Sequence, residues 1–323
     1  MHVYAYRVAV VGVTGYAGRE LERLLLHHPD IQISGRFASA ASDGVEAFSI
    51  ERLKAVGADV VVLATEHDFS LEWVPRLLSD GFRVLDMSGA FRIKDAGLYP
   101  DWYGFTHTAP ELLKEAVYGL PEIHSKLIAG ARLVANPGCY ATAAILPLFP
   151  LYGAGALDPE STVVVDGKSG VSGAGRKPKP ETHFCSVNEN LSAYGVLKHR
   201  HTPEMVSHLP GATLQRFVFT PHLIPISRGI LATIVVRQRD RTPLGPILVD
   251  AYADSPFVRI FTDRMPDIHE VVRTNACHIG ILSRNDTTVM VSTIDNLVKG
   301  AAGQAVQNLN LMLAVHPAAG LLL

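Results

Sequence analysis

Cysteine is scarce in this sequence of 323 residues, and its scarcity excludes two classes of protein. Cys139, Cys185 and Cys277 are odd in number and widely spaced, which is not the pattern of a disulfide framework. A zinc ribbon is also excluded, because no Cys-x-x-Cys pair is present. Unpaired cysteines are typical of a reducing compartment, so we expect a cytoplasmic protein.

An excess of charge and a long apolar run are missing as well. Lys and Arg number 29 against 31 Asp and Glu, whereas proteins that bind nucleic acid through its phosphates are usually strongly basic. The charge-free stretch 133–157 is interrupted by prolines and glycines, and a membrane-spanning helix needs about 20 continuous apolar residues. Residues 1–7 lack the basic and apolar regions of a signal peptide. We therefore expect no nucleic-acid or membrane partner, and we interpret 133–157 as a strand, a turn and a buried helix.

Apolar residues make up 48% of the chain, and the length is that of about two domains. In the first half, short apolar runs alternate with helical patterns, which favours a parallel sheet with right-handed crossovers. The predicted strands span residues 7–12, 31–37, 59–65, 82–87 and 133–135, and helices are predicted at 16–27 and 71–78.

The second half has longer β-rich runs and fewer helices, which predicts a mixed or antiparallel sheet in an α+β domain. Strands are predicted at residues 162–165, 214–219, 229–237 and 288–294, and a last helix at 297–315. A Pro-Gly turn within residues 136–139 marks the boundary between the halves.

Gly12, Gly15 and Gly18 stand between the first predicted strand and the first predicted helix. Glycine lets the backbone turn tightly and approach a pyrophosphate, and the helix N-terminus then supplies N–H donors. The spacing is G-x-x-G-x-x-G rather than G-x-G-x-x-G, so an ordinary strand–helix turn stays an alternative. The context favours a dinucleotide site.

The end of the second predicted strand bears on the choice of dinucleotide. An NAD site usually has Asp or Glu there to bind the ribose 2′-hydroxyl. Residues 35–42 contain no acid but include Arg36, Ser39 and Ser42, which suit a 2′-phosphate. The sequence therefore favours NADP over NAD.

Cys139 follows the Pro-Gly turn and stands at the start of a predicted helix. The helix dipole stabilises a thiolate at that position, which makes the sulfur a nucleophile near neutral pH. Free cysteines are otherwise small buried hydrophobes, and we expect that role for Cys185 and Cys277.

His199 and His201 precede Glu204 in a short polar segment. If the segment is extended, residues i and i+2 point the same way, so the two imidazoles would lie together. A histidine near a cysteine serves as its base or as a proton donor, and Glu204 would orient one ring. A pair of surface histidines is the alternative. We expect no metal, because no further ligands cluster nearby.

Residues 167–180 combine glycines and serines with four basic residues and no acid. The polar residues are Lys168, Ser169, Ser172, Arg176, Lys177 and Lys179. Such a loop suits the phosphate groups of a cofactor or substrate. A mobile surface loop is the alternative, and a nucleic-acid site is disfavoured because no aromatic residues are interleaved.

These segments resemble the N-acetyl-γ-glutamyl-phosphate reductases, NADPH-dependent enzymes of arginine biosynthesis. The matching segments are GVTGYAG (12–18), YGLPE (118–122), NPGCYATAA (136–144), KSGVSGAGR (168–176), HFCSVNENLSAYG (183–195), HRHTPE (199–204), FTPHLIPISRGIL (219–231) and IDNLVKGAAGQAVQN (294–308). They follow the family's order over nearly the whole chain, and the HRHTPE segment is typical of the family's long form.

The resemblance implies a glyceraldehyde-3-phosphate dehydrogenase-like fold. An α/β Rossmann domain that binds NADP(H) is expected at residues 1–138, and an α+β catalytic and oligomerisation domain at 139–295. A C-terminal helix, within 296–323, is expected to return to the Rossmann domain. The resemblance also implies a homo-oligomer, a dimer or tetramer, that acts on a small acyl phosphate through a cysteine thioester.

Individual roles are implied in the same way. Cys139 is the expected nucleophile and His201 the acid–base group, with His199 and Glu204 assisting. Asn136, Arg92 and Lys168 are expected to contact the substrate. The residues expected to line the NADP site are Gly12, Thr14, Gly15, Tyr16, Ala17, Gly18, Ser39, Ser88, Ser169, Gly170 and Asn296.

Two departures from the family pattern are visible. Ala90 stands where family members often have an acid, and residues 38–58 are shorter than usual. Two other functions stay open: a reductase of a related acyl phosphate, aspartyl phosphate or carrier-bound aminoadipyl phosphate, and a non-catalytic NADP-binding sensor. The intact Cys139 argues against the sensor.

Overall fold

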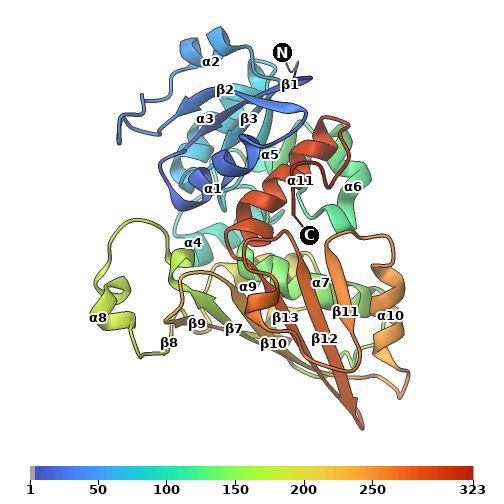
Figure 1. Ribbon diagram of the computed structural model, residues 1–323. Helices are drawn as coiled ribbons and strands as arrows, with labels where there is room; N and C mark the ends of the chain where they lie inside the picture. The colour runs from blue at the N-terminus through green and yellow to red at the C-terminus, as the bar shows by residue number, and fades with distance from the viewer. Residues whose placement is uncertain (1–3, 323) are drawn as a thin grey trace. The chain divides into compact units, whose positions relative to one another are not determined.

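The computed structural model describes residues 4–322 and divides into two compact units (Figure 1). The first unit contains the chain up to Gly138 and the returning segment Ala301–Leu322, and the second unit contains Cys139–Gly300. The expected fold class is confirmed, because each unit has a sheet of the predicted kind. The chain returns to the first unit at Ala301, slightly later than the sequence indicates.

The sheet of the first unit is parallel, as the alternation of strands and helices predicts. Its strands are β1 (Tyr6–Val11), β2 (Ile31–Phe37), β3 (Val60–Leu63), β4 (Arg83–Asp86), β5 (Val117–Tyr118) and β6 (Leu133–Ala135), in the order β2-β1-β3-β4-β6-β5. Because β2 and β3 flank β1 on opposite sides, the strand order reverses there. The carboxyl ends of β1 and β3 therefore form the switch point at which such sheets bind ligands.

Helices cover this sheet and bury its central strands. They are α1 (Tyr16–Leu25), α2 (Ile50–Val56), α3 (His67–Ser79), α4 (Tyr99–Tyr103), α5 (Pro110–Glu115), α6 (Pro121–Gly130) and α11 (Gly303–Met312), with a 3-10 turn, η1, at Ala96–Leu98. Leu21 and Leu25 of α1 are buried at the spacing of one helical turn. Residues 8–11 and 60–63 are fully buried, which is typical of strands covered on both faces.

The returning helix α11 packs against α1 and α6 within the first unit (Figure 1). Its buried amide side chains donate to the backbone of that unit. Gln304 Nε2 lies 3.1 Å and Asn308 Nδ2 lies 2.8 Å from the carbonyl oxygen of Gly119. The helix predicted at 297–315 is shorter in the structure, because Val298–Ala302 form a π-helix (η6) ahead of α11.

The second unit is built on a seven-stranded sheet in the order β11-β12-β13-β10-β7-β9-β8. Its strands are β7 (Val163–Gly170), β8 (Ser192–Ala193), β9 (Phe217–Ile224), β10 (Ile230–Arg237), β11 (Val258–Phe261), β12 (Cys277–Arg284) and β13 (Thr287–Ile294). β7 is parallel to β9 and β11 is parallel to β12, whereas β10, β12 and β13 pair antiparallel. The prediction of a mixed or antiparallel sheet is confirmed.

The strand β7 is longer than its prediction. It continues to Gly170, so residues 167–170 are part of the sheet and not of a loop. Gly167 and Gly170 resemble strand breakers in the sequence, but β9 and β10 pair with β7 on both sides and keep it extended. A Cβ on Gly167 would lie 2.6 Å from the ring of Tyr140, so this glycine makes room for an aromatic side chain.

Helix α7 (Cys139–Gly153) packs on β10 and β13 and is buried over most of its length. The charge-free stretch of the sequence is therefore a strand, a turn and a buried helix, as predicted. The other helical elements of the second unit are α8 (Phe184–Val187), α9 (His201–Ser207) and α10 (Leu244–Ala251), with 3-10 turns η2 (Val171–Ala174), η3 (Pro180–Thr182), η4 (Leu214–Arg216) and η5 (Ile268–Glu270). Within residues 4–322, no helix has both the length and the apolar character needed to cross a bilayer.

Candidate active site

The glycine motif lies at the carboxyl end of β1, where the chain enters α1. Gly12 has a φ of 92°, and a Cβ there would lie 2.2 Å from the carbonyl oxygen of Ala64. A Cβ on Gly18 would lie 2.1 Å from the carbonyl oxygen of Gly12. Both positions therefore need glycine for close packing of strand and helix. Gly15 differs, because a Cβ there would meet its nearest atom only at 3.7 Å, in ordinary contact.

The first turn of α1 suits a phosphate group. Gly15 is the N-cap residue, no side chain caps the helix, and the first turn holds no acid. The N–H groups and the positive end of the helix dipole favour an anion at this position. Thr14, Tyr16 and Ala17 belong to the same turn, so the structure brings the expected pyrophosphate residues together.

The loop after β2 carries the residues expected at a 2′-phosphate. Ser39 and Ser42 are exposed in it. Arg36, the last but one residue of β2, forms an ion pair with Glu22 of α1. The guanidinium is half exposed, so its charge stays close to this loop.

A second arginine reaches the same loop from α1. Arg19 Nη2 lies 3.0 Å from Asp43 Oδ2, and both side chains are largely exposed. Sequence reasoning missed this pair, because Asp43 falls directly after the acid-free segment and Arg19 belongs to a different element. The sequence feature that could have revealed the pair is the position of Arg19 directly after Gly18 of the glycine motif.

Ser88, expected in the NADP site, lies buried after β4 beside a buried carboxylate. Its hydroxyl donates to Asp86 Oδ2 at 2.8 Å and accepts from the backbone N–H of Ala90 at 3.1 Å. Asp86 also accepts from Ser70 Oγ at 2.7 Å. Burial raises the pKa of Asp86, and these hydrogen bonds oppose that rise. The Ser88 hydroxyl thus links the buried Asp86 carboxylate to the backbone N–H of Ala90.

Asn136 and Arg92, expected to contact the substrate, are also buried and engaged within the first unit. Arg92 Nε donates to the carbonyl oxygen of Asn136 at 2.8 Å. The Asn136 amide donates to the carbonyl oxygen of Ala301 at 3.1 Å and accepts from Asn308 Nδ2 at 3.0 Å. These contacts fix the segment that leads into α7. The partners lie up to 172 residues away, so the sequence did not reveal them.

Cys139 is the first residue of α7, as predicted, and is partly buried. No acid stands in the first turn of this helix, so the dipole acts on the sulfur unopposed there. Cys277 is buried, with Sγ 3.5 Å from Ser292 Oγ, as expected for a small core residue. Cys185 is exposed, so the expectation that it is buried is wrong.

The two histidines lie together, but not in an extended segment as the sequence analysis assumed. His199 lies in a turn closed by a hydrogen bond from Thr202 N to its carbonyl oxygen, and His201 begins α9. The ring centroids are 4.7 Å apart and the rings meet edge to face. The tight turn brings the imidazoles together where strand geometry was expected to do so.

Aromatic rings surround His199. Those of Tyr140, Tyr194 and Phe219 have centroids 5.8, 5.6 and 5.3 Å from it. Loss of solvent and the nearby charge of Arg200 lower the pKa of His199 to about 4. Its Nδ1 lies 3.1 Å from the backbone N–H of His201 and accepts that hydrogen bond. At neutral pH the ring is therefore uncharged, with its proton on Nε2.

His201 has a different environment. Its Nε2 lies 4.0 Å from Oε2 of Glu204, one helical turn later, and the Glu204 side chain is fully buried. Across residues 4–322, no group of three or more His, Cys, Asp or Glu side chains has the arrangement of a metal site.

Two tyrosines that sequence reasoning missed adjoin these residues. The hydroxyls of Tyr140 and Tyr194 are 3.4 Å apart, and Tyr140 donates to the carbonyl oxygen of His222 at 3.1 Å. Desolvation raises the pKa of Tyr194 to about 12 and that of Tyr140 further, so both hydroxyls stay protonated. Tyr140 directly follows Cys139, which was the available sequence signal.

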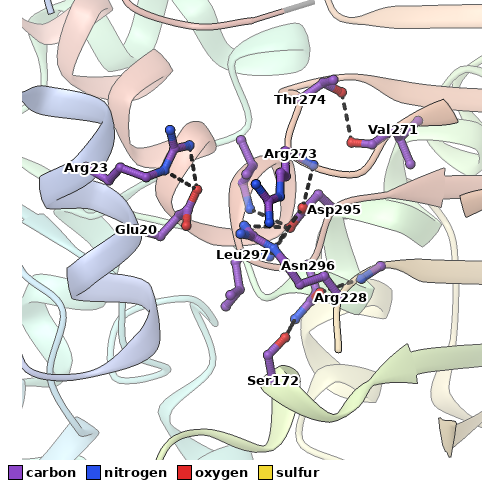
Figure 2. Close-up of polar contacts among 12 residues, drawn as sticks. Glu20, Arg23, Ser172, Arg228, Val271, Arg273, Thr274, Asp295, Asn296 and Leu297 are labelled. Carbon is purple, nitrogen blue, oxygen red and sulfur yellow. Dashed lines mark hydrogen bonds and ion pairs between the residues drawn. The ribbon is translucent and has the colours of Figure 1, made fainter. Parts of the chain in front are cut away.

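Asn296, Ser169 and Gly170 come together at the end of β7. The Asn296 amide accepts from the backbone N–H of Gly229 at 2.7 Å and donates to Ser172 Oγ at 2.9 Å (Figure 2). Ser169 Oγ donates to the carbonyl oxygen of Gly170 at 3.0 Å. These contacts shape the loops around the end of the strand.

Lys168 lies on the other face of the sheet. Side chains alternate along a strand, so Lys168 points away from the side of Ser169. It forms an ion pair with Asp166, whose Oδ1 lies 3.5 Å from His222 Nδ1. Lys168 and Ser169 therefore lie on opposite faces of the sheet, because β7 extends through residues that the sequence placed in a loop. The expected contact of Lys168 with the substrate stays a prediction.

Comparisons with known proteins cover both units. The description "Semialdehyde dehydrogenase, NAD binding domain" matches residues 7–131, and "Semialdehyde dehydrogenase, dimerisation domain" matches residues 139–296. Aspartate semialdehyde dehydrogenase II of Vibrio cholerae has the same fold, with a TM-score of 0.72 at 18% identity over 97% of this chain and 99% of that one. The Candida albicans aspartate semialdehyde dehydrogenase, solved with NADP, gives 0.66 at 15% identity over 95% and 98%.

Sequence relatives give a finer assignment. The chain is 43% identical to N-acetyl-gamma-glutamyl-phosphate reductase of Dehalococcoides mccartyi over 98% of this chain and 97% of that protein. The corresponding values are 42%, 98% and 96% for the Neisseria meningitidis reductase and 45%, 95% and 94% for that of Magnetococcus marinus. Identity at this level over nearly the full length, with an NAD(P)-binding domain and a dimerisation domain, shows that the chain belongs to the N-acetyl-gamma-glutamyl-phosphate reductase family of oxidoreductases.

Proposed function

We propose that this chain reduces N-acetyl-γ-glutamyl phosphate to N-acetylglutamate semialdehyde with NADPH, in the cytoplasm, as a step of arginine biosynthesis. The observation that carries the proposal is the start of α7, where Cys139 begins the helix in a unit that also brings two imidazoles and a buried carboxylate together. The relatives at 42–45% identity bear the name of this reaction.

Cys139 supplies the nucleophile. Its thiolate attacks the acyl-phosphate carbonyl, a carbon–sulfur bond forms, and phosphate leaves with the electrons of the carbon–oxygen bond. Bound NADPH supplies a hydride to the carbonyl carbon of the thioester. The resulting thiohemiacetal then collapses: its hydroxyl loses a proton, the carbonyl reforms and the Cys139 thiolate is released with the aldehyde.

We assign these proton transfers to His201, whose Nε2 lies 4.0 Å from the buried carboxylate of Glu204. It would donate a proton to the developing alkoxide and accept it again at collapse. His199 is held uncharged by its aromatic surroundings and therefore assists by position rather than by charge. Glu204 would orient the His201 ring.

The preference for NADPH rests on the residues of α1 and β2. Gly12, Gly15 and Gly18 would hold the pyrophosphate, as the open space at Gly15 allows. Arg19 and Arg36 lie beside the loop after β2 and would meet a 2′-phosphate. Both acids of this loop are paired, Asp43 with Arg19 and Glu46 with Arg52, and are therefore poorly placed for a ribose hydroxyl.

We also propose a homo-oligomer, because the second unit matches a dimerisation domain.

A reverse-direction assay tests the proposed reaction. NADP and phosphate are supplied with N-acetylglutamate semialdehyde or, in parallel, with aspartate semialdehyde, and the appearance of NADPH is followed at 340 nm, roughly its absorption maximum. We expect clear preference for the acetylated substrate. Turnover with aspartate semialdehyde alone would move the assignment to the aspartyl enzyme. Turnover with neither, in a protein that binds NADPH, would favour a carrier-bound substrate or a sensor.

Two variants test the residue roles. Cys139→Ser should lose reductase activity by about 10⁴-fold while keeping its affinity for NADPH, because the thiolate is removed and the first unit is unchanged. His201→Asn should lower kcat by about 10²- to 10⁴-fold and change the pH–rate profile. Normal turnover of the serine variant would disprove the covalent mechanism, and an unchanged profile would remove His201 from proton transfer.

A further inference from the structure

The chain leaves β13 through a π-helix, which is an uncommon element. Asp295 and Asn296 follow the strand, and Val298–Ala302 form the π turn. The backbone N–H of Gly300 donates to the carbonyl oxygen of Asp295 at 2.9 Å, which is the five-residue spacing of a π-helix. Such turns are frequent at functional sites.

Gly300 packs directly against Cys139. A Cβ at Gly300 would lie 2.7 Å from the Cβ and 3.2 Å from the Cα of Cys139. The first distance is shorter than real Cβ contacts, so any side chain here would displace the cysteine or the turn. The φ of Gly300 is not positive, so close approach alone requires glycine at this position.

A buried carboxylate fixes the start of the turn. Asp295 Oδ1 accepts from the backbone N–H groups of Leu297 and Val298 at 2.8 and 3.1 Å. Its Oδ2 accepts from the N–H of Arg273 at 2.7 Å and lies 3.1 Å from Arg228 Nε (Figure 2). The Asp295 side chain is fully buried, so this charge is held by one arginine and three backbone donors and cannot relax into water.

We propose that Asp295 and Gly300 are positioning residues for the Cys139 thiol. The carboxylate sets the π turn, and the bare backbone of Gly300 then limits where the first residue of α7 can sit. The dipole effect on a thiolate falls off within the first helical turn. A small displacement of the sulfur therefore changes both its orientation toward the substrate and its pKa. The proposal rests on the proposed role of Cys139 as the nucleophile.

The test compares two glycine-to-alanine variants of the full-length protein. Gly300→Ala adds one methyl group against Cys139, and Gly153→Ala adds the same group at the other end of α7, where no atom lies within 4 Å. Both are made with Cys185→Ser, so that alkylation by iodoacetamide reports Cys139, since Cys277 is buried. Alkylation rates from pH 6 to 10, roughly the range of thiol ionisation, are measured with kcat, KM and the NADPH dissociation constant.

We expect Gly300→Ala to raise the midpoint of the alkylation profile and to lower kcat by about 100-fold, with unchanged NADPH affinity, because a displacement of about 1 Å can have that effect. Gly153→Ala should match the parent in every measurement. A parent-like alkylation profile and kcat for Gly300→Ala would overturn the proposal.

Asp295→Asn is a second test, and it serves even if Gly300→Ala does not fold. This variant keeps the shape of the side chain but removes the charge that holds Arg228. We expect the midpoint of the alkylation profile to rise here as well, but by less. An unshifted profile would overturn the role of Asp295. Failure of the proposed function is seen separately: if Cys139→Ser turned over normally while Gly300→Ala still shifted alkylation, the thiol would be positioned but would not be the nucleophile.

Discussion

His199 and His201 are two residues apart, and yet their surroundings differ. Aromatic rings enclose His199, whereas Nε2 of His201 lies 4.0 Å from the buried carboxylate of Glu204. Desolvation disfavours a charged imidazole, and it is the main cause of the lowered pKa of His199. The candidate site therefore contains at least one imidazole that is neutral at pH 7.

The lowered pKa of His199 predicts a pH dependence of stability. The pKa is about 4 in the folded protein and 6.5 as the ordinary value, so between these pH values the unfolded state binds more protons. This stability is present above pH 6.5 and is lost as the pH falls towards 4. From pH 7 to pH 5 the loss amounts to at most about 2 kcal/mol of unfolding free energy.

Urea unfolding of the parent and of His199→Gln at pH 7 and at pH 5 measures this loss of stability. The variant lacks the titrating ring and should lose less stability on acidification. His27→Gln is the control, because that histidine is exposed. Equal losses in the parent and in His199→Gln would show that the ring is not desolvated.

Residue chemistry was predictable where it depended on chain neighbours. Cys139 begins a helix because Pro-Gly precedes it, and the sequence shows this directly. The contacts of Lys168 and Arg92 were not predictable, because the direction of a side chain depends on strand pairing and on partners far away in the sequence. Tyr194 was missed for the same reason, since its contact with Tyr140 joins residues 54 positions apart.

At the scale of elements, the glycines of the β1–α1 connection have two different roles: Gly12 allows close packing, and Gly15 leaves open space at the helix N-terminus. Gly12→Ala should destabilise the protein by more than about 2 kcal/mol, because it places a Cβ 2.2 Å from a backbone oxygen at a positive φ. Gly15→Ala should stay within about 0.5 kcal/mol of the parent, because its φ is −76° and the space is open.

Gly15→Ala should nevertheless bind NADPH more weakly, since the methyl group occupies the approach to the helix N-terminus. Urea unfolding and titration of NADPH fluorescence give the two quantities. Undiminished NADPH affinity in Gly15→Ala would place the pyrophosphate elsewhere.

The loop between β2 and α2 predicts a second effect at this scale. Arg19→Ala should lower the affinity for NADPH by about 10-fold, the effect of one charge-assisted contact, and leave the affinity for NADH nearly unchanged. Asp43→Asn should raise the affinity for NADPH, because it releases Arg19. Arg23→Ala, which alters an arginine of the same helix paired with Glu20, is the matched control. An equal loss for NADH and NADPH would show that Arg19 does not read the 2′-phosphate.

Elements were predicted best where periodicity was strong and uninterrupted. β1, β3 and α1 agree with their predictions to within a few residues. β7 does not, because Gly167 resembles a strand breaker but serves as a point of close packing. The helix predicted at 297–315 begins instead with the π turn η6, where Gly300 packs against Cys139. No local pattern distinguishes a glycine that ends an element from one that admits a neighbour.

At the scale of the whole molecule, the second unit has a sheet face that α7 does not cover. Val164 is 38% exposed there, and Leu231 of the central strand β10 is half-buried on the same side. Exposed apolar faces of this kind mark protein contacts. Together with the match to a dimerisation domain, this face predicts self-association through the sheet.

Light scattering after gel filtration tests this prediction. The parent should have a mass of at least about 70 kDa, twice the 34.9 kDa of one chain. Leu231→Arg should reduce the measured mass to that of a single chain. The control Val249→Arg, on the exposed side of α10, should keep the mass of the parent. A monomeric parent, or an unaffected Leu231→Arg, would contradict the prediction.

The hydrogen bond between Asn136 and Ala301 joins two points that are 165 residues apart, and this has a consequence for synthesis. Residues 139–300 leave the ribosome before the segment that completes the first unit. The usual order of domain folding, N-terminal first, is therefore reversed: the second unit can finish while the parallel sheet of the first still lacks α11. We expect the nascent chain to be most sensitive to chaperones and proteases in that interval, and truncation just before Ala301 to yield a folded second unit beside an incomplete nucleotide-binding one.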